Sequence, residues 1–176
     1  MRQGAACIRD YVEYHIPTPK ETDMIPANIT NKSGSTNRNN LICWIKDEKV
    51  KDYFLEYAKT INIQAGWNFD IDIIEDLQYT VYTGGHEYGW HADQHQKPYP
   101  DGRMRKISFS LCLSNDYEGG EFDLEVRHPG ADQRYESMKL KENEILWFKS
   151  AYYHRVNPVT SGKRISLVGW VLGKNC

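Results

Sequence analysis

The sequence predicts a mainly β fold of the sandwich or jelly-roll type with one or two supporting helices near the N-terminus. Three observations favour this class. Beyond Gly66 the hydrophobic pattern changes to a period of two, short strand-like segments follow one another, and Gly, Pro and Asn-Asp punctuate them. Many short strands with such turns are typical of sandwiches and jelly rolls. The 176 residues, 40% of them hydrophobic, fit a single domain (1–176) with a substantial core.

The first 66 residues (1–66) are predicted to support this core with helical and loop segments. Residues 1–16 are weakly periodic and indicate a short helix. Residues 17–40 are rich in Pro, Asn, Ser, Thr and Gly, so they offer little apolar surface to bury. We therefore expect a long, mobile surface loop over 17–40.

A short strand and a longer helix are expected next. Residues 41–45 have the apolar character of a strand, and Asp47 is a suitable N-cap for the helix that follows. Gly66 supplies a signal for the end of that helix. The apolar residues between them recur at helical spacing and should pack on a sheet: Val50, Tyr53, Phe54, Tyr57, Ala58 and Ile61.

Residues 67–176 are predicted to form the β core. The run Asn68-Phe-Asp-Ile-Asp-Ile-Ile alternates polar and apolar residues, and Ile107-Ser-Phe-Ser-Leu-Cys-Leu alternates large apolar with small side chains. Such alternation indicates strands with one face buried in an apolar core. The strands expected from these patterns cover 68–74, 77–83, 107–113, 121–126, 135–140, 144–148 and 164–172.

Composition argues against several classes of protein. The formal net charge is only −2, so no broad basic surface favours nucleic acid as a partner. The four cysteines are widely spaced without a Cys-x-x-Cys pair, which argues against a disulfide framework or a zinc knuckle. No apolar run approaches the ~20 residues of a membrane span. We expect a soluble cytoplasmic protein with no membrane partner, and the oligomeric state stays open.

The pair His91 and Asp93 is the strongest candidate metal site. Residues at i and i+2 of an extended segment project to the same side. A third ligand, His154, arrives from distant sequence and completes one triangular face of a metal. Two imidazoles and one carboxylate with the opposite face open suit non-haem Fe(II) enzymes, which must bind both a co-substrate and O₂.

Three motifs around these residues resemble a known family. They are Tyr82-x-x-Gly-x-x-Tyr-Gly-x-His-x-Asp, Ser108-Phe-Ser-Leu-Cys-Leu-Ser-Asn-Asp-Tyr-Glu-Gly-Gly-Glu, and His154-Arg-Val-x-Pro-Val-Thr-x-Gly-x-Arg. In this order and spacing they resemble the 2-oxoglutarate- and Fe(II)-dependent dioxygenases, most closely the prolyl/lysyl hydroxylase-like (PKHD-type) branch. The resemblance covers roughly residues 75–173. It implies a double-stranded β-helix, the cupin-like form of the jelly roll.

The resemblance also assigns roles to individual residues. It implies that His91, Asp93 and His154 hold Fe(II). Arg164 would bind the distal carboxylate of 2-oxoglutarate, since a guanidinium matches a carboxylate with two parallel N–H bonds. Ser166 and Tyr82 would add hydrogen bonds to the co-substrate. Three further residues are predicted substrate contacts because of their strand position or their loop next to the metal pair: Gln78, Tyr99 and Arg103.

The function implied by the resemblance is hydroxylation of a C–H bond on a prolyl or lysyl residue of a peptide or protein. The reaction would consume O₂ and 2-oxoglutarate and release succinate and CO₂, with L-ascorbate as a candidate reductant. A free amino acid or small metabolite stays open as the substrate. A nucleic-acid demethylase of the same fold is disfavoured, since Trp170 stands where that branch carries a second arginine. A cupin-type enzyme without 2-oxoglutarate and a non-catalytic binding module are the remaining alternatives.

Overall fold

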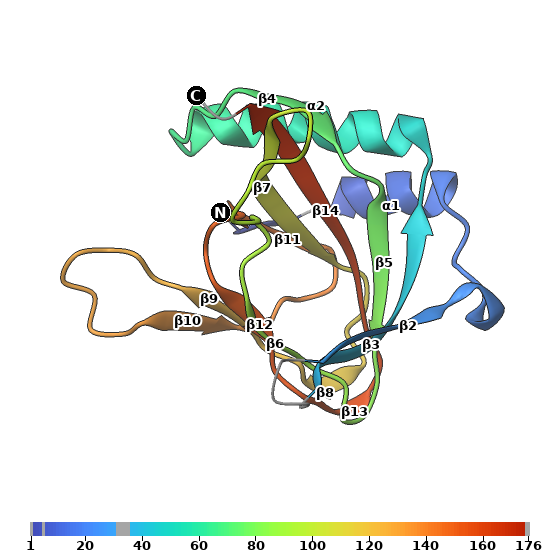
Figure 1. The fold of residues 1–176 in the computed structure, drawn as a ribbon. Helices are drawn as coiled ribbons and strands as arrows, with labels where there is room; N and C mark the ends of the chain where they lie inside the picture. The colour runs from blue at the N-terminus through green and yellow to red at the C-terminus, as the bar shows by residue number, and fades with distance from the viewer. Residues whose placement is uncertain (1, 5, 31–35, 175–176) are drawn as a thin grey trace.

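A computed structural model describes residues 2–4, 6–30 and 36–174 (Figure 1). In chain order the elements are β1 (Arg2–Gly4), α1 (Ala6–His15), the 3-10 helix η1 (Glu21–Asp23), β2 (Ile25–Thr30), β3 (Thr36–Ile45), α2 (Glu48–Gln64), β4 (Ile71–Ile74), β5 (Leu77–Tyr82), β6 (Tyr88–His91), β7 (Arg103–Cys112), β8 (Tyr117–Gly119), β9 (Phe122–Glu125), β10 (Tyr135–Met138), β11 (Glu144–Lys149), β12 (His154–Val156), β13 (Val159–Gly162) and β14 (Arg164–Lys174).

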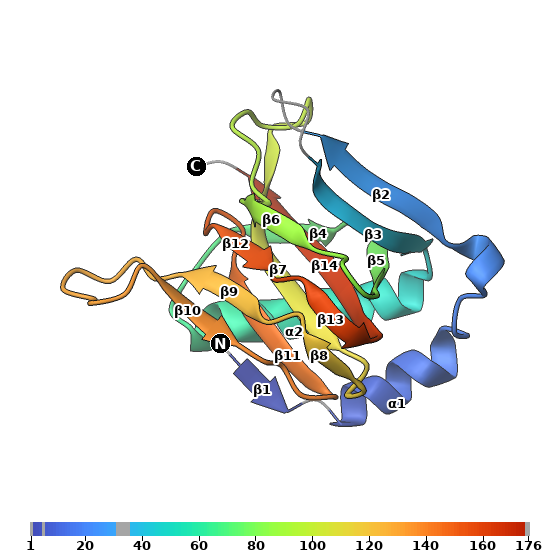
Figure 2. The ribbon, with the colours of Figure 1, turned by 90° about the horizontal axis from the view of Figure 1, so that it is seen from below.

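The strands form one large curled antiparallel sheet and a small second sheet. The path through the large sheet is β1-β11-β7-β14-β5-β3-β6-β12-β9-β10, with β2 paired to β3 and β4 paired to β14. Strands β13 and β8 form the second sheet. Both α-helices of the described residues lie together on one side of the large sheet, while the β9–β10 hairpin extends away from it (Figures 1 and 2). The predicted mainly β jelly-roll fold with supporting helices is confirmed.

Helix α2 begins and ends as the sequence predicts. The Asp47 carboxylate accepts a hydrogen bond from the backbone N–H of Val50 at 3.0 Å, and this satisfies one of the free donors of the first turn. At the other end Gly66 adopts a φ of 64°, a conformation that favours glycine. The buried face of α2 packs on the sheet, where Phe54 stacks on Phe109 with ring centroids 4.6 Å apart.

The central strands separate two layers by strict alternation. On β7 the side chains of Ile107, Phe109 and Leu111 belong to the core beneath the helices, and those of β11 and β14 with the same orientation join them. The intervening residues, such as Ser108 and Cys112, face the inside of the curled sheet. Because successive strand residues point to opposite faces, one row can stabilise the helix layer while the other row lines the interior.

The structure corrects the prediction for residues 17–40. Residues 25–30 and 36–40 of this segment belong to strands β2 and β3, which pair in an antiparallel ladder with Ala27 opposite Asn40, and β3 pairs on its other side with β5. The polar composition of 17–40 was misleading for a physical reason. The backbone N–H and C=O groups of β3 form hydrogen bonds with two neighbouring strands, and this pairing does not require apolar side chains. Residues 31–35 of the predicted loop lie outside the described residues.

The first 66 residues therefore do more than support the core. They contribute β1, β2 and β3 to the large sheet as well as both helices. Strand β3 is central, because it pairs with β5 on one side and β6 on the other and so joins the two halves of the curled sheet. Among the described residues no helix is both long and apolar enough to cross a membrane.

Candidate metal centre and its cavity

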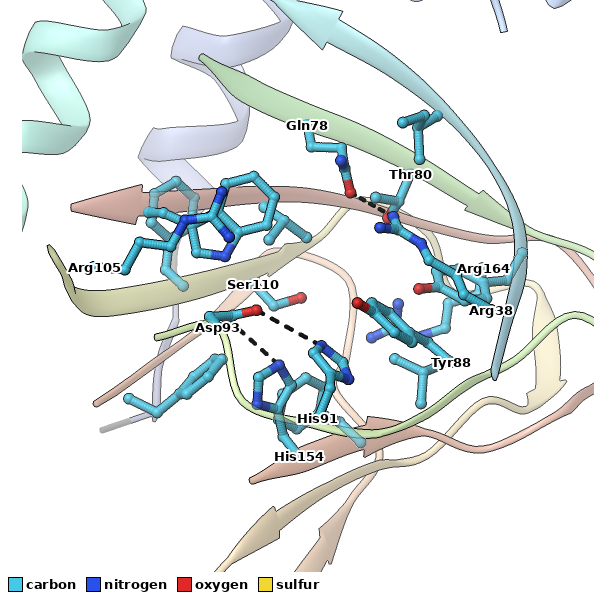
Figure 3. Close-up of a pocket in the computed structure, with 18 of the residues that line it drawn as sticks. Arg38, Gln78, Thr80, Tyr88, His91, Asp93, Arg105, Ser110, His154 and Arg164 are labelled. Atoms are coloured by element: carbon cyan, nitrogen blue, oxygen red, sulfur yellow. Dashed lines mark hydrogen bonds and ion pairs between the residues drawn. The ribbon is translucent and has the colours of Figure 1, made fainter. Parts of the chain in front are cut away.

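Strand pairing brings the three predicted metal ligands together. His91 is the last residue of β6, His154 is the first residue of β12, and these two residues are direct partners in the β6–β12 ladder. Asp93 follows β6 and places its carboxylate between the imidazoles (Figure 3). Its Oδ1 lies 3.6 Å from His91 Nε2, and its Oδ2 lies 3.5 Å from His154 Nε2. One ligand atom from each residue lies within 4.8 Å of the others, as a shared ion requires.

Backbone carbonyls orient both imidazoles. His91 Nδ1 lies 2.8 Å from the carbonyl oxygen of Gly89, and His154 Nδ1 lies 3.0 Å from that of Tyr152. A carbonyl oxygen can only accept a hydrogen bond, so each Nδ1 carries the proton. Both Nε2 atoms therefore direct a lone pair toward the position that faces Asp93, the arrangement of metal-binding histidines.

The charge state of the cluster suits a divalent metal. Burial, together with the neighbouring His154, lowers the pKa of His91 to about 4, so this imidazole is neutral at neutral pH. Burial would raise the pKa of Asp93, but His154, His91 and a hydrogen bond from Ser108 outweigh it and lower the pKa below its usual range. Neutral imidazoles and an ionised carboxylate are the forms that bind metals. The donor set, two nitrogens and one oxygen on one side, fits Fe(II).

The cluster opens into a cavity of about 240 Å³ inside the curled sheet. Six of the predicted site residues line it: Gln78, Tyr82, His91, Asp93, His154 and Arg164. Arg164 and Tyr82 are partners in the β14–β5 ladder. The Arg164 Nη1 donates to Ser166 Oγ at 2.6 Å, which places Ser166 beside the guanidinium. The structure thus brings together the metal triad, Arg164, Tyr82, Ser166 and Gln78.

Arg164 is a buried cation that lacks an anionic partner. Only 2% of the residue is exposed, and its Nε has no hydrogen-bond partner. Within the described part of the chain, no carboxylate forms an ion pair with it. An unpaired buried charge is strongly destabilising. The guanidinium is therefore suited to a carboxylate supplied by a ligand, and its unpartnered Nε provides one of the donors.

The structure does not bring Tyr99 and Arg103 to this cavity. The Tyr99 hydroxyl donates to Glu75 Oε1 at 2.9 Å. The Arg103 guanidinium forms ion pairs of 2.7 Å with Asp72 and 2.9 Å with Asp101. Neither residue lines the cavity. Both side chains are engaged at the end of the sheet where β7 begins, so their predicted contact with substrate finds no support in the geometry.

Four residues that sequence reasoning missed line the same cavity. Arg105 pairs with Glu75 and lies over the Trp170 ring, with its guanidinium carbon 4.1 Å from the ring centroid. Trp44 lies 6.2 Å from Trp170, centroid to centroid, and is 41% exposed. The fourth is Arg38 on β3. Extending the alternation of residues 41–45 backward would have placed Arg38 and Trp44 on one face.

Comparisons with known proteins agree with this geometry. The family model of the 2OG-Fe(II) oxygenase superfamily matches residues 77–172. A PKHD-type hydroxylase from Idiomarina loihiensis is 41% identical over 92 residues, which are 51% of this chain and 38% of the relative. A PKHD-type hydroxylase from Hyphomonas neptunium is 39% identical over 126 residues, which are 70% of this chain and 54% of the relative. The chain thus spans about a third to a half of the length of these curated relatives.

A solved structure supports the fold. The crystal structure of a Pseudomonas putida prolyl-4-hydroxylase superposes with a TM-score of 0.71 at 19% identity, covering 100% of this chain and 92% of the other. At that identity the likeness concerns the fold alone, which is the double-stranded β-helix predicted above. The family match covers more than half of the chain and includes the triad and Arg164. This chain therefore belongs to the 2OG-Fe(II) oxygenase superfamily.

Proposed function

We propose that this chain hydroxylates a C–H bond of a prolyl or lysyl residue in a peptide or protein, with 2-oxoglutarate as the co-substrate. Membership of the superfamily implies Fe(II), 2-oxoglutarate and O₂. The observation that carries the proposal is that a single cavity contains both the metal triad and the unpaired Arg164. The role of L-ascorbate as a reductant stays a prediction.

Five residues of the cavity have roles in this proposed reaction. A bound Fe(II) would supply the one-electron and O₂ chemistry. His91, Asp93 and His154 would hold it, Arg164 would bind one carboxylate of 2-oxoglutarate, and Tyr82 would donate a hydrogen bond to the co-substrate. In the overall balance, one oxygen atom of O₂ enters the substrate C–H bond as a hydroxyl. The other enters succinate, as one carboxyl group of 2-oxoglutarate leaves as CO₂.

The mouth of the cavity supports a substrate with an aliphatic ring or chain. Trp44 and Trp170 form an aromatic wall, and Arg105 covers one face of Trp170. Flat aromatic surfaces bind apolar groups of matching shape over a large contact area. A pyrrolidine ring or the methylene chain of a lysine fits such a wall. The hydroxylase names of the relatives are consistent with this choice.

A peptide screen tests the proposed function. The chain, loaded anaerobically with Fe(II), is exposed to O₂ with 2-oxoglutarate and a library of prolyl and lysyl peptides. We expect one peptide class to gain a single oxygen atom, in a mass spectrum, only when 2-oxoglutarate is present, with equimolar succinate. The Asp93→Ala variant is the matched control without the metal carboxylate. If succinate forms but no prolyl or lysyl peptide increases the rate of its formation, the prolyl or lysyl assignment is wrong.

Gly120 offers a test of the co-substrate side of the cavity. It has a φ of 65°, and a Cβ added there would lie 3.0 Å from the Arg164 Cδ and 3.0 Å from the Val159 Cγ2. We expect Gly120→Ala to displace the guanidinium and raise the Kd of 2-oxoglutarate several-fold, as measured by calorimetric titration. The positive φ also costs roughly 1–2 kcal/mol of stability for a residue with a Cβ.

Gly130→Ala is the matched control for this prediction. Gly130 has a φ of 86°, but a Cβ there would meet no atom within 4 Å. This variant therefore carries the same kind of backbone strain without contact with Arg164. If both variants change the Kd of 2-oxoglutarate equally, the effect of Gly120→Ala is one of general stability and the steric argument is wrong.

A further inference from the structure

A second unpaired cation lies in the same cavity as Arg164. Arg38 is 9% exposed, and its guanidinium donates from Nε to Asn40 Oδ1 at 2.7 Å and from Nη2 to Gln78 Oε1 at 2.6 Å. Both partners are neutral amides. Among the described residues no carboxylate forms an ion pair with Arg38, whereas Arg105, the third arginine of the cavity, is paired with Glu75. Arg38 therefore keeps a buried charge that no acidic group of the described chain neutralises.

The charge balance of the cavity leaves a place for one more anion. A divalent metal beside Asp93 leaves one positive charge, and Arg164 and Arg38 add two more. The two carboxylates of 2-oxoglutarate neutralise two of these three charges. Because a buried unpaired charge is costly, the remaining positive charge favours a further anionic group when metal and co-substrate are bound.

Arg38 and Arg164 are held by different side chains of the cavity. Arg38 Nη2 donates to Gln78 Oε1 at 2.6 Å (Figure 3), whereas Arg164 Nη1 donates to Ser166 Oγ at 2.6 Å. Gln78 pairs with Val168 on β14, four residues beyond Arg164 and two beyond Ser166. A carboxylate held by Arg164 therefore leaves the Arg38 guanidinium, at its separate anchor, available to another carboxylate.

The surroundings of Arg38 belong to the substrate side. Its guanidinium carbon lies 4.6 Å from the centroid of the Tyr88 ring, and Tyr88 stacks on the metal ligand His91 at 3.5 Å between centroids. Gln78 is also the ladder partner of Trp44, the exposed residue of the aromatic wall. The Arg38 head thus lies between the metal ligands and the mouth through which a substrate enters.

We propose that Arg38 binds a carboxylate of the substrate that is hydroxylated, so that the substrate class is carboxylate-bearing. The carboxylate has two sources: the α-carboxylate of a free amino acid or of a C-terminal residue, or an acidic side chain beside the target residue. This inference rests on the proposed function. A planar guanidinium held by Asn40 and Gln78 is well suited to such a group, because its orientation is fixed before the ligand arrives.

Paired probes that differ only in charge test the proposal. L-proline is compared with L-prolinamide, and the peptide Gly-Pro with its C-terminal amide, which together examine the α-carboxylate. N-acetylated, C-amidated Pro-Glu is compared with Pro-Gln that carries the same two blocking groups, which examines the acidic side chain. Binding is followed by tryptophan fluorescence with Zn(II) and 2-oxoglutarate bound, since Zn(II) has no redox chemistry and Trp44 and Trp170 line the cavity. We expect at least one acid to bind about tenfold or more tightly than its amide.

Two substitutions of Arg38 then assign the preference to this residue. Arg38→Gln should remove the preference of the wild-type protein for the acid over the amide, while Arg38→Lys, which keeps the charge, should retain part of it. The Kd of 2-oxoglutarate should change less than twofold in either variant. Arg134→Gln, which removes a charge from an exposed loop between β9 and β10, is the matched control and should keep the full preference.

The outcomes separate this inference from the proposed function. A wild-type chain that binds no acid more tightly than its amide contradicts the Arg38 proposal. The proposal is also contradicted if Arg38→Gln weakens the binding of acid and amide equally, or if it weakens the binding of 2-oxoglutarate instead. Absence of succinate formation in the Fe(II)-loaded wild type would contradict the proposed function, yet the binding comparison with Zn(II) would still decide the role of Arg38.

Discussion

Asp93→Ala is expected to abolish succinate formation and to remove most of the affinity for a divalent metal. The carboxylate of Asp93 is the group that faces both Nε2 atoms, at 3.6 Å and 3.5 Å. Its loss leaves the two imidazoles with no negative ligand beside them. The expected loss of metal affinity exceeds the roughly 10–100-fold that removal of a ligand's hydrogen-bond partner costs. His91→Ala and His154→Ala should behave alike.

Anaerobic titration with Fe(II), followed by calorimetry, measures this effect directly. Succinate is quantified separately, and circular dichroism confirms that the variants are folded. His95→Ala is the matched control, because His95 is exposed and only two residues from Asp93. It should keep the metal affinity of the wild type. An Asp93→Ala variant with unchanged metal affinity would show that the triad is not the metal site.

Arg164→Ala should raise the Kd of 2-oxoglutarate by well over tenfold. The guanidinium is buried, it donates to Ser166 Oγ, and among the described residues no carboxylate forms an ion pair with it. Truncating one partner of a buried charge pair costs about 2–5 kcal/mol. Arg164→Lys should bind 2-oxoglutarate more tightly than Arg164→Ala but less tightly than the wild type, because lysine keeps the charge without bidentate hydrogen bonding.

Lys163→Ala is the control for this second prediction. Lys163 precedes Arg164 but is exposed, so its loss should leave the affinity nearly unchanged. Calorimetric titration of 2-oxoglutarate into the Zn(II)-loaded variants gives the comparison without turnover. A Kd within twofold of the wild type in Arg164→Ala would move the carboxylate to another cation, and Arg38 would be the next to test.

The predictable parts of the fold are the elements in which an apolar pattern repeats over many residues. Helix α2 and strands β5, β7, β11 and β14 each repeat an apolar pattern over six or more residues, which is enough to reveal which face is buried. Strands β6, β8, β12 and β13 have only three or four residues and were missed, because no longer alternating run surrounds them, whereas the equally short β4, β9 and β10 lie within the alternating runs 68–74, 121–126 and 135–140. These strands are defined by their hydrogen-bonded pairing with other strands, and this pairing cannot be read from the sequence.

The metal triad was predictable because its chemistry is local. His91 and Asp93 are two residues apart, and His154 lies in a motif of its own. The substrate side was not, because proximity in sequence is a poor guide there. Arg103 was chosen for its closeness to the triad, yet the chain carries it to the far end of β7, and Arg105 lines the cavity instead. Arg38 was missed because the predicted strand begins at residue 41, whereas β3 begins at Thr36, so Arg38 fell in the predicted loop.

The alternation along β7 and β14 has a consequence for protein engineering. On β7, Ser110 lines the cavity and Leu111 packs beneath the helices, while Phe109 belongs to the helix-side core and also reaches the cavity. On β14, Val168 faces the cavity and Leu167 faces the helix layer. Apart from Phe109, substitutions at adjacent residues of these strands are therefore expected to act on different properties, ligand selectivity at the cavity-facing positions and stability at the helix-facing ones. A library that randomises only every second residue of these strands can explore new specificities while leaving most of the helix-facing packing intact.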